Sequence, residues 1–321
     1  MARWPAARAA CLVAAIGMAG CGSGAPPEQQ QQPPPPPAIA PSPPAQPSSE
    51  RLKLPKKVGS LRLAAIGDAG RGDRWQYDVS AQMQAFRAVF PFDIVLMLGD
   101  NVYDGGTPTD YRLKFELPYK SFLDAGVKFF ATIGNHDDPN QPFYTPFNMG
   151  GERYYTVKSE SLAVRLTGTN VRFFMVDTER LDRPQLEWID REMSGSAAAW
   201  KIPIFHRPIY TSGRYALPAI RLRSLLEPMF VRHGVRVAFS GHEHFYERIA
   251  PQNGITYFIS GGAGSLRVGD LRRTGLTAQA FDGDLHFMLI EISGDELYFQ
   301  AISRTGETID SGMIRRQEGD K

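Results

Sequence analysis

The sequence has very little cysteine: its 321 residues include two, Cys11 and Cys21. Both precede the part of the chain whose composition suits a folded core. If Cys11 is removed with a signal peptide and Cys21 carries a lipid, the folded part has no thiol for a disulfide, a nucleophile or a thiolate metal site. Any metal there must then be held by oxygen and nitrogen ligands.

A long apolar run is also missing near the N-terminus. The run at residues 9–18 is shorter than the roughly 20 residues that a transmembrane helix needs. It follows Arg3 and Arg8 and precedes small residues before Cys21, as in bacterial lipoprotein signal peptides. We predict a signal peptide at residues 1–20 and a lipid on Cys21 that anchors the protein outside the cytoplasm, in the periplasm or at the cell surface. An ordinary secretory signal or a misplaced start is the alternative.

Apolar residues are scarce in residues 21–56, which hold almost half of the chain's 25 prolines together with Gln, Ser and Ala. Such a segment cannot bury an apolar face, and runs of proline favour an extended, solvated conformation. We interpret it as a disordered tether, and disorder without a role is the alternative. Residues 57–316 contain no low-complexity break or repeat, and their length suits one α/β domain.

A strong net charge is lacking too. The chain has 36 basic and 34 acidic residues, and loss of Arg3 and Arg8 with the signal peptide would leave 34 of each. A balanced charge gives no general attraction for nucleic acid, so no nucleic-acid partner is expected. Any attraction for anions must be local. The sequence leaves the oligomeric state open.

In residues 57–316, patterns typical of buried strands alternate with helical patterns. Strands are expected at residues 61–67, 92–100, 127–137, 171–178, 201–208, 235–244, 255–262 and 285–303. Helical spacing of apolar residues predicts helices at 78–90, 182–193 and 222–234. The pattern is typical of an α/β fold with antiparallel strands at its C-terminal end.

Polar residues follow five of the expected strands at the point where each apolar run ends. They are Asp68, Asp100, Asn135 with His136, His206, and His242 with His244. Ligands bind at this edge in open α/β sheets. A single Asp there would be an ordinary helix cap, but five endings with metal-binding side chains indicate a metal site.

Five short motifs carry these residues in order: "GDAG", "GDNVY", "GNHD", "IFH" and "GHEH". The set resembles the calcineurin-like metallophosphoesterases and, within them, the purple acid phosphatase branch. The resemblance covers roughly the whole domain. It implies a four-layer α/β/β/α sandwich of two mixed sheets flanked by helices, with the metal site at the strand C-terminal edge. The fourth motif departs from the pattern, because Pro203 stands where an aliphatic residue is usual.

The resemblance also implies the ligands of two metals. The first would be held by Asp68, Asp100, Tyr103 and His244, and the second by Asp100, Asn135, His206 and His242. Other branches have a histidine two residues after the first Asp, where this chain has Gly70, and Tyr103 takes its place. A phenolate is a hard, negatively charged donor that suits Fe(III). The implied centre is therefore Fe(III) with Fe(II), Zn(II) or Mn(II).

The implied activity is hydrolysis of small phosphate esters, as an acid phosphomonoesterase whose metal-bound hydroxide attacks phosphorus in line. His136 would act next to the metals, giving a proton to the leaving oxygen or stabilising its charge. A phosphodiesterase or nucleotide pyrophosphatase would use the same centre. A surface lipoprotein with a non-catalytic, phosphatase-like fold is a further alternative.

Other side chains are weaker candidates. Four could line the substrate pocket: Arg207, Tyr210, Arg214 and Tyr246. Two histidines, His233 and His286, are expected to be structural. The first precedes a glycine at a helix end, and the second lies in an apolar strand.

Overall fold

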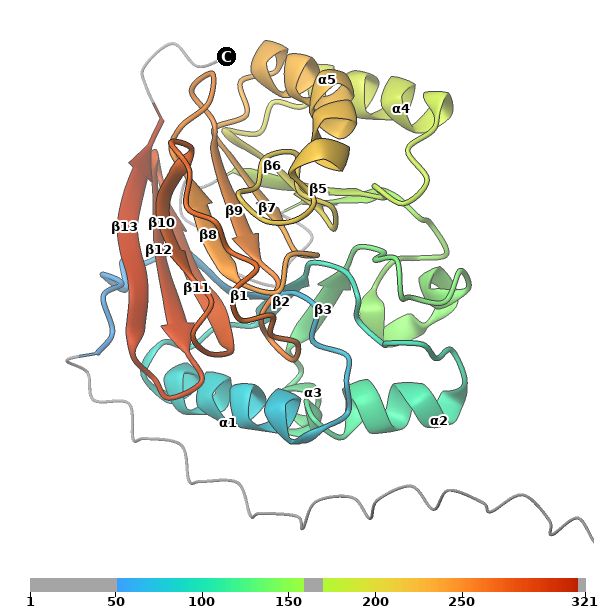
Figure 1. The fold of residues 1–321 in the computed structure, drawn as a ribbon, viewed down its shortest axis with the longest axis vertical. Coiled ribbons are helices and arrows are strands. Elements are labelled where there is room, and N and C mark those ends of the chain that lie inside the picture. Colours follow the sequence, from blue (N-terminus) through green and yellow to red (C-terminus); the bar gives the residue numbers. More distant parts are fainter. Residues whose placement is uncertain (1–50, 159–169, 317–321) are drawn as a thin grey trace, which may run out of the picture. The chain divides into compact units, whose positions relative to one another are not determined.

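A computed structural model describes residues 51–158 and 170–316 of the chain (Figure 1). The predicted signal peptide, Cys21 and all but the last residues of the predicted tether lie outside this part. None of the helices described combines the length and the apolar character that crossing a membrane requires.

Two mixed β-sheets form the centre of the described part. The first has the strand order β13-β12-β11-β1-β2-β3 and consists of β1 (Leu61–Ile66), β2 (Ile94–Met97), β3 (Lys128–Ala131), β11 (His286–Ser293), β12 (Glu296–Ser303) and β13 (Thr308–Arg315). Strands β1, β2 and β3 are parallel, and β11 to β13 continue the sheet in antiparallel pairs.

The second sheet has the order β10-β8-β9-β7-β6-β5-β4. Its strands are β4 (Tyr155–Lys158), β5 (Val171–Val176), β6 (Trp200–Phe205), β7 (Val237–Ser240), β8 (Tyr246–Ile249), β9 (Thr256–Ser260) and β10 (Thr277–Phe281). Strands β5, β6, β7 and β9 are parallel, so their carboxyl ends meet at one edge. Pro203, which has no N–H to donate, lies just before the first β6–β7 pair, Ile204 with Phe239.

The two sheets pack face to face through a buried apolar layer. Leu63 and Leu96 of the first sheet belong to the same cluster as Phe173, Ile202 and Phe239 of the second. Alternate residues of β1 and β2 point away from this layer into a second cluster beneath the helices. Burial on both faces explains why these strands read as continuous apolar runs rather than as alternating patterns.

Helices cover the outer face of each sheet (Figure 1). The first sheet is covered by α1 (Arg74–Val89), α2 (Pro108–Tyr111), the π-helical turn η1 (Arg112–Glu116) and α3 (Lys120–Asp124). The second is covered by α4 (Arg183–Ser194) and α5 (Ala216–Arg232), and the short turns η2 (Gln141–Phe143) and η3 (Thr145–Phe147) follow β3. The predicted four-layer α/β/β/α sandwich is confirmed.

The three predicted helices exist, but two begin earlier than expected. Helix α1 begins at Arg74 because Asp73 caps it, accepting hydrogen bonds from the backbone N–H of Trp75 (3.0 Å) and Gln76 (3.4 Å). Helix α5 begins at Ala216 instead of residue 222. Its first turns expose Leu217 (80%) and Ile220 (48%), so they lack a buried apolar stripe to reveal the helix.

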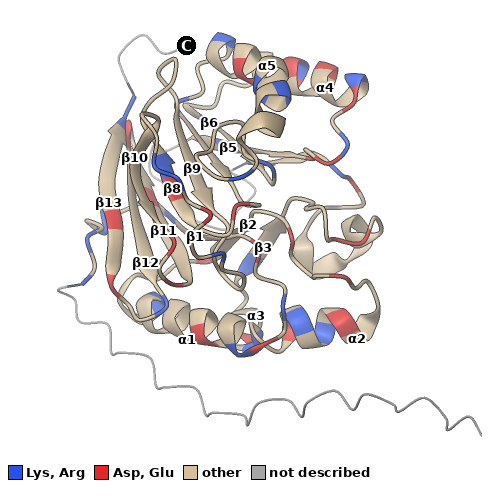
Figure 2. Ribbon diagram, viewed as in Figure 1, with Lys and Arg blue, Asp and Glu red and all other residues tan. Residues whose placement is uncertain are grey.

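Charged residues lie mainly outside the sheets. In Figure 2 most of the strand length is tan, whereas α2, α4, α5 and many loops carry blue or red segments. The acidic and histidine side chains just beyond the strand ends are therefore exceptional, since they are buried although most charged side chains are not.

Candidate metal centre

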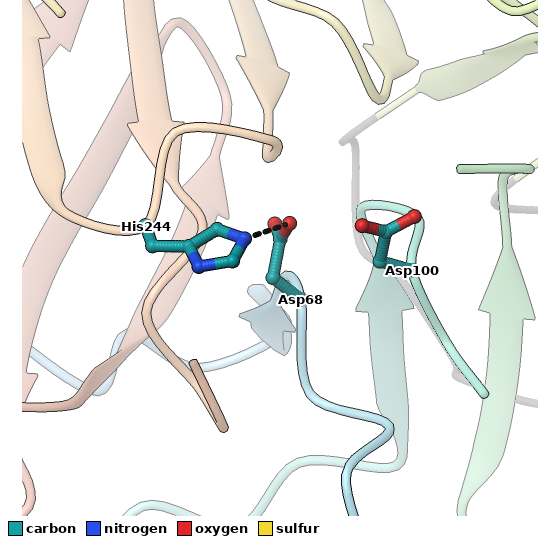
Figure 3. Close-up of side chains that lie close together, drawn as sticks. All are labelled: Asp68, Asp100 and His244. Carbon is teal, nitrogen blue, oxygen red and sulfur yellow. Dashed lines mark ion pairs between the residues drawn. The ribbon is translucent and has the colours of Figure 1, made fainter. Parts of the chain in front are cut away.

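The carboxyl ends of strands from both sheets bring the predicted polar residues together. Asp68 follows β1 and Asp100 follows β2, and Figure 3 shows their carboxylates side by side, with His244 reaching them from beyond β7. Ligand atoms of these three buried residues all lie within 4.8 Å of one another. A cation could be bound by all three at once.

The backbone at this edge is strained. Asp68, Asp100 and His242 have positive φ angles of 56°, 51° and 68°. Such conformations cost non-glycine residues about 1 kcal/mol or more, and they persist where surrounding contacts enforce them. Here the Asp68 N–H donates to the Gly99 carbonyl (3.0 Å), and the His242 N–H donates to Asp68 Oδ2 (2.7 Å). The strain aims the side chains at a common point.

One group of side chains surrounds the Tyr103 hydroxyl. The Tyr103 Oη lies 3.3 Å from Asp68 Oδ1 and 3.1 Å from His244 Nε2, and these last two atoms are 3.2 Å apart. All three residues are buried. The structure thus places the tyrosine beside the residues with which the sequence grouped it.

Gly70 explains how the tyrosine reaches this position. The Gly70 N–H donates to the Asp100 carbonyl (3.2 Å), and the Tyr103 N–H donates to the Gly70 carbonyl (2.9 Å). A Cβ atom on Gly70 would lie 2.0 Å from the carbonyl oxygen of Asn101. A histidine at position 70 is therefore incompatible with this course of the Tyr103 loop, so the glycine and the tyrosine belong together.

A second group surrounds His206. Its Nδ1 lies 2.9 Å from the Leu98 carbonyl and must donate to it, which turns Nε2 toward Asn135 Oδ1 (3.2 Å) and Asp100 Oδ1 (3.4 Å). His242 Nδ1 is 3.1 Å from the same Nε2. Unprotonated, Nε2 would face two oxygen acceptors, so the geometry calls for a positive charge, either a proton or a metal ion.

The electrostatic interactions among the protein groups of the site also favour a bound cation. Burial raises the pKa of Asp68 well above its ordinary value, and the charge of Asp100 adds to this. Burial and the Asp68 and Asp100 charges raise the pKa of Tyr103. Burial opposes a raised pKa for His206, but the charges of Asp100 and Asp68 outweigh it. A bound cation would reverse these penalties and stabilise the ionised oxygens.

The two histidines of the "GHEH" motif are kept neutral, which is the form that binds metals. Burial, followed by the charges of His206 and Arg207, lowers the pKa of His242. Burial, followed by the charge of Arg267, lowers the pKa of His244 to about 3. Arg207 Nη1 lies 3.1 Å from His242 Nε2, and its Nε donates to Glu179 (2.9 Å).

His136 lies beside the two groups rather than within them. Its backbone N–H donates to Asp100 Oδ1 (2.9 Å), its Nδ1 lies 2.9 Å from Asp104 Oδ1, and its ring packs 4.9 Å from that of Tyr103. The side chain is 38% exposed and faces a cleft of about 720 Å³. This position suits a proton-transferring group better than a ligand.

The cleft opens beside the Tyr103 group. Its lining forms four groups: Arg71, Asp73 and Trp75 near the start of α1; Tyr103, Asp104, His136 and His244 of the site; Gly264–Arg267 after β9; and Gly283–Leu285, just before β11, with Arg304, just after β12. Polar and charged groups thus line the cleft that His136 faces.

Sequence reasoning missed two residues that hold the site in place. Asp137 accepts hydrogen bonds from the backbone N–H of Asn101 (2.7 Å), Val102 (2.9 Å) and Gly134 (2.8 Å), which ties the loops after β2 and β3 together. Loss of hydration and the Asp100 charge raise the pKa of Asp137 to about 8. The position of Asp137 at the end of the "GNHD" motif was the sequence feature that could have identified it.

Glu243 is the second missed residue. It is fully buried between His242 and His244 in the chain, and its Oε1 accepts from the Tyr215 N–H (3.0 Å) and from the Thr211 hydroxyl (3.1 Å). The carboxylate fixes the loop before α5 against the "GHEH" segment.

None of the four weaker candidates is among the residues that line this cleft. Tyr210 binds Glu227, Tyr246 binds Asp310, Arg214 pairs with Asp270, and Arg207 contacts His242 and Glu179. The two histidines expected to be structural lie as expected, since His233 Nε2 is 2.7 Å from Asp190 and His286 is fully buried in β11.

Comparisons with known proteins show the family to which the chain belongs. The family model "Calcineurin-like phosphoesterase" matches residues 61–246. Purple acid phosphatase 17 of Arabidopsis thaliana is 24% identical over 241 residues, which cover 65% of this chain and 70% of that protein. Fe(3+)-Zn(2+) purple acid phosphatase 12 of the same plant is 26% identical over 237 residues, covering 65% and 48%.

Two solved structures share the fold. GAP50, the anchor in the inner membrane complex of Plasmodium, has a TM-score of 0.68 at 18% identity and covers 81% of this chain and 90% of its own. The purple acid phosphatase PPD1 from yellow lupin has a TM-score of 0.64 at 20% identity, covering 81% and 55%.

Proposed function

The chain belongs to the calcineurin-like phosphoesterases, in the purple acid phosphatase branch, and is a metal-dependent phosphoester hydrolase with a dinuclear centre; from this premise we propose that it is an iron-containing phosphomonoesterase. The proposed metals are Fe(III) with Fe(II), Zn(II) or Mn(II), and the substrates are small phosphate esters.

The observation that carries the proposal is the position of Tyr103. Its hydroxyl lies within 3.3 Å of both Asp68 Oδ1 and His244 Nε2. A phenolate in that place gives a metal site two anionic oxygens and one nitrogen, a set that favours Fe(III) over softer ions. The relative named an Fe(3+)-Zn(2+) enzyme supports this choice of metals.

The residues of the site divide between two ions as the spacing of their atoms suggests. Asp68, Asp100, Tyr103 and His244 would hold the ferric ion, and Asp100, Asn135, His206 and His242 the divalent ion. Asp100 belongs to both sets because Oδ1 faces His206 and the carboxylate lies beside Asp68 (Figure 3). When bound, the two ions would lower the pKa of a water molecule and stabilise the charge of a phosphoryl group.

The chain's own groups then orient the ester and handle the proton. His136 stands at the cleft wall, where it can give a proton to the oxygen of the leaving alcohol. Asp104, 2.9 Å from His136 Nδ1, holds the ring so that Nε2 is directed away from this carboxylate.

A binding-only protein is the second candidate, because the structural neighbour GAP50 is described as an anchor. Against it, every predicted ligand position in this chain carries a side chain able to bind a metal, and the atoms converge.

The proposed location is outside the cytoplasm, with the domain attached to a bacterial membrane through lipid on Cys21.

Metal analysis combined with an ester panel tests the function. Purified protein should contain about one iron and one further metal ion per chain. It should hydrolyse nitrophenyl phosphate faster than bis-nitrophenyl phosphate. Protein that holds both metals yet cleaves neither ester would refute the enzymatic proposal.

A further inference from the structure

The loop that follows β9 forms one wall of the cleft and is fixed against the metal centre by its backbone. The Ala263 N–H donates to the Gly67 carbonyl (3.0 Å), and the Arg267 N–H donates to the His244 carbonyl (3.2 Å). Gly264 packs so closely on Ala69 that a Cβ atom would lie 2.4 Å from its carbonyl oxygen. The side chains of this loop are therefore held at a fixed place beside the site.

One guanidinium nitrogen of this loop lacks a partner within the described part of the chain. Arg267 Nη1 and Ser265 Oγ are both buried from solvent, and Arg267 Nη1 has no hydrogen-bond partner there, whereas the Ser265 side chain contacts the Tyr103 hydroxyl. Both residues line the cleft together with Tyr103, His136 and His244. A buried guanidinium nitrogen without a partner is costly, unless a ligand supplies the missing acceptor.

Arg267 differs in this respect from the other arginines of the cleft. Arg304 pairs with Asp284 (2.9 Å) and Asp78 (3.4 Å), and Arg71 lies 3.7 Å from Asp73. No carboxylate among the described residues pairs with Arg267. Its positive charge also reaches the site, since it contributes to the lowered pKa of His244. The cleft thus contains a guanidinium that forms no close ion pair, next to the metal ligands, and its charge also acts on the buried Asp68 and Glu243 carboxyl groups.

We propose that Arg267, with Ser265 as a second donor, binds a non-bridging oxygen of the ester's phosphoryl group and thereby selects doubly charged phosphate monoesters over singly charged diesters. The inference rests on the proposed function and names two residues that determine its specificity. A monoester carries one more terminal oxygen and one more negative charge than a diester. A guanidinium directed at that oxygen therefore favours the monoester.

The test replaces Arg267 by Gln, which removes the charge and keeps the polar end, and uses Arg272→Gln as the matched control. Arg272 is exposed, lies further along the same segment and does not line the cleft. In Arg267→Gln, kcat/KM for nitrophenyl phosphate should fall about 10- to 100-fold, as expected for loss of a charged hydrogen bond. The value for bis-nitrophenyl phosphate should change by less than about 3-fold. Arg272→Gln should leave both values unchanged.

Titration of the metal-loaded protein with inorganic phosphate gives a readout that does not depend on turnover. Affinity should fall by a similar factor in Arg267→Gln, by less in Arg267→Lys, and not at all in Arg272→Gln. If the protein cleaves neither ester, the proposed function fails, but the phosphate titration still decides the role of Arg267. An unchanged phosphate affinity and an unchanged ester ratio, with metals retained, would overturn the inference, as would loss of metal from Arg267→Gln. If Arg267→Gln does not fold, Arg267→Lys must show the same changes to a smaller degree, or the inference is wrong.

Discussion

The hydroxyl oxygen of Tyr103 lies 3.1 Å from Nε2 of His244, although 141 positions separate the two residues in the chain. One comes from the loop after β2 of the first sheet and the other from the loop after β7 of the second. Their contact joins the two sheets at the metal centre. It also explains why Gly70 has no side chain, since the tyrosine loop occupies the space that one would fill.

Gly70→Ala should therefore disturb the centre without removing any ligand. The added Cβ would meet the Asn101 backbone at 2.0 Å, so the Tyr103 loop must shift. We expect the free energy of unfolding to fall by about 1–3 kcal/mol, the usual range for overpacking, and iron content to fall with it. Gly275→Ala is the control, because a Cβ there meets nothing within 4 Å. Equal stability and iron content in both variants would show that the close approach of this loop is not required.

His136→Ala should retain the metals and lose turnover. The ring is at the cleft wall, and its Nδ1 contacts Asp104 rather than a proposed ligand, so metal content should match that of the wild type. We expect kcat to fall by roughly 10²- to 10⁴-fold, the range for loss of a proton-transferring group. His233→Ala, at the distant end of α5, should leave kcat unchanged. Loss of a metal from His136→Ala would make it a ligand instead.

His286 should make the fold sensitive to acid. Burial lowers its pKa to about 3, and a backbone contact with Asp284 does not offset this effect. Unfolded chains bind a proton here below about pH 6.5, whereas the folded state stays neutral, so stability is lost as pH falls. Between pH 6.5 and 5 the loss should reach about 2 kcal/mol.

Denaturant unfolding between pH 7 and 5 measures this effect. His286→Leu should flatten the dependence of unfolding free energy on pH, because the titrating group is gone. His233→Gln, which replaces a histidine that contacts Asp190, should retain most of the wild-type slope. A slope in His286→Leu as steep as that of the wild type would place the acid sensitivity elsewhere.

The proposed membrane anchor can be tested with the two cysteines, which lie on either side of the predicted cleavage site. Cys21 would carry the lipid, and Cys11 serves as the control. Cys21→Ser should release the protein from the membrane fraction of bacterial cells, because the lipid attachment atom is lost. Cys11→Ser should stay in that fraction. Both variants are read by fractionation and labelling with a fatty acid. If Cys21→Ser remains membrane-bound and labelled, the lipoprotein prediction is wrong.

Much of the fold could be predicted from the sequence, because strands buried on both faces are continuous apolar runs that end at polar residues. β1 and β2 have this form, and Asp68 and Asp100 mark their ends. The strands β4, β8, β10 and β13 were not predicted separately. β13 is exposed along most of its length at a sheet edge, and the others have four or five residues, which is too short for a clear period.

The sequence also predicted much of the candidate metal site. Residues directly after strands could be placed at one edge by topology alone, and the structure brings all of them together. Glu243 and Arg267 act through loops whose course depends on tertiary contacts, so nothing in their local sequence shows what they touch; for Asp137 only its place in the "GNHD" motif pointed to the site. For the same reason the local sequence does not show the partners of Tyr210 and Tyr246, since Glu227 and Asp310 are distant in sequence.

The central claim is that the Tyr103 oxygen binds a ferric ion, and the visible absorption spectrum of Tyr103→Phe, recorded with its iron content, tests it most directly. The wild type should be coloured by charge transfer from tyrosinate to iron. The variant keeps the ring and loses one oxygen, so we expect the band to disappear and iron content to fall, with the fold intact by circular dichroism. A variant that keeps the same band and the same iron content would contradict the account.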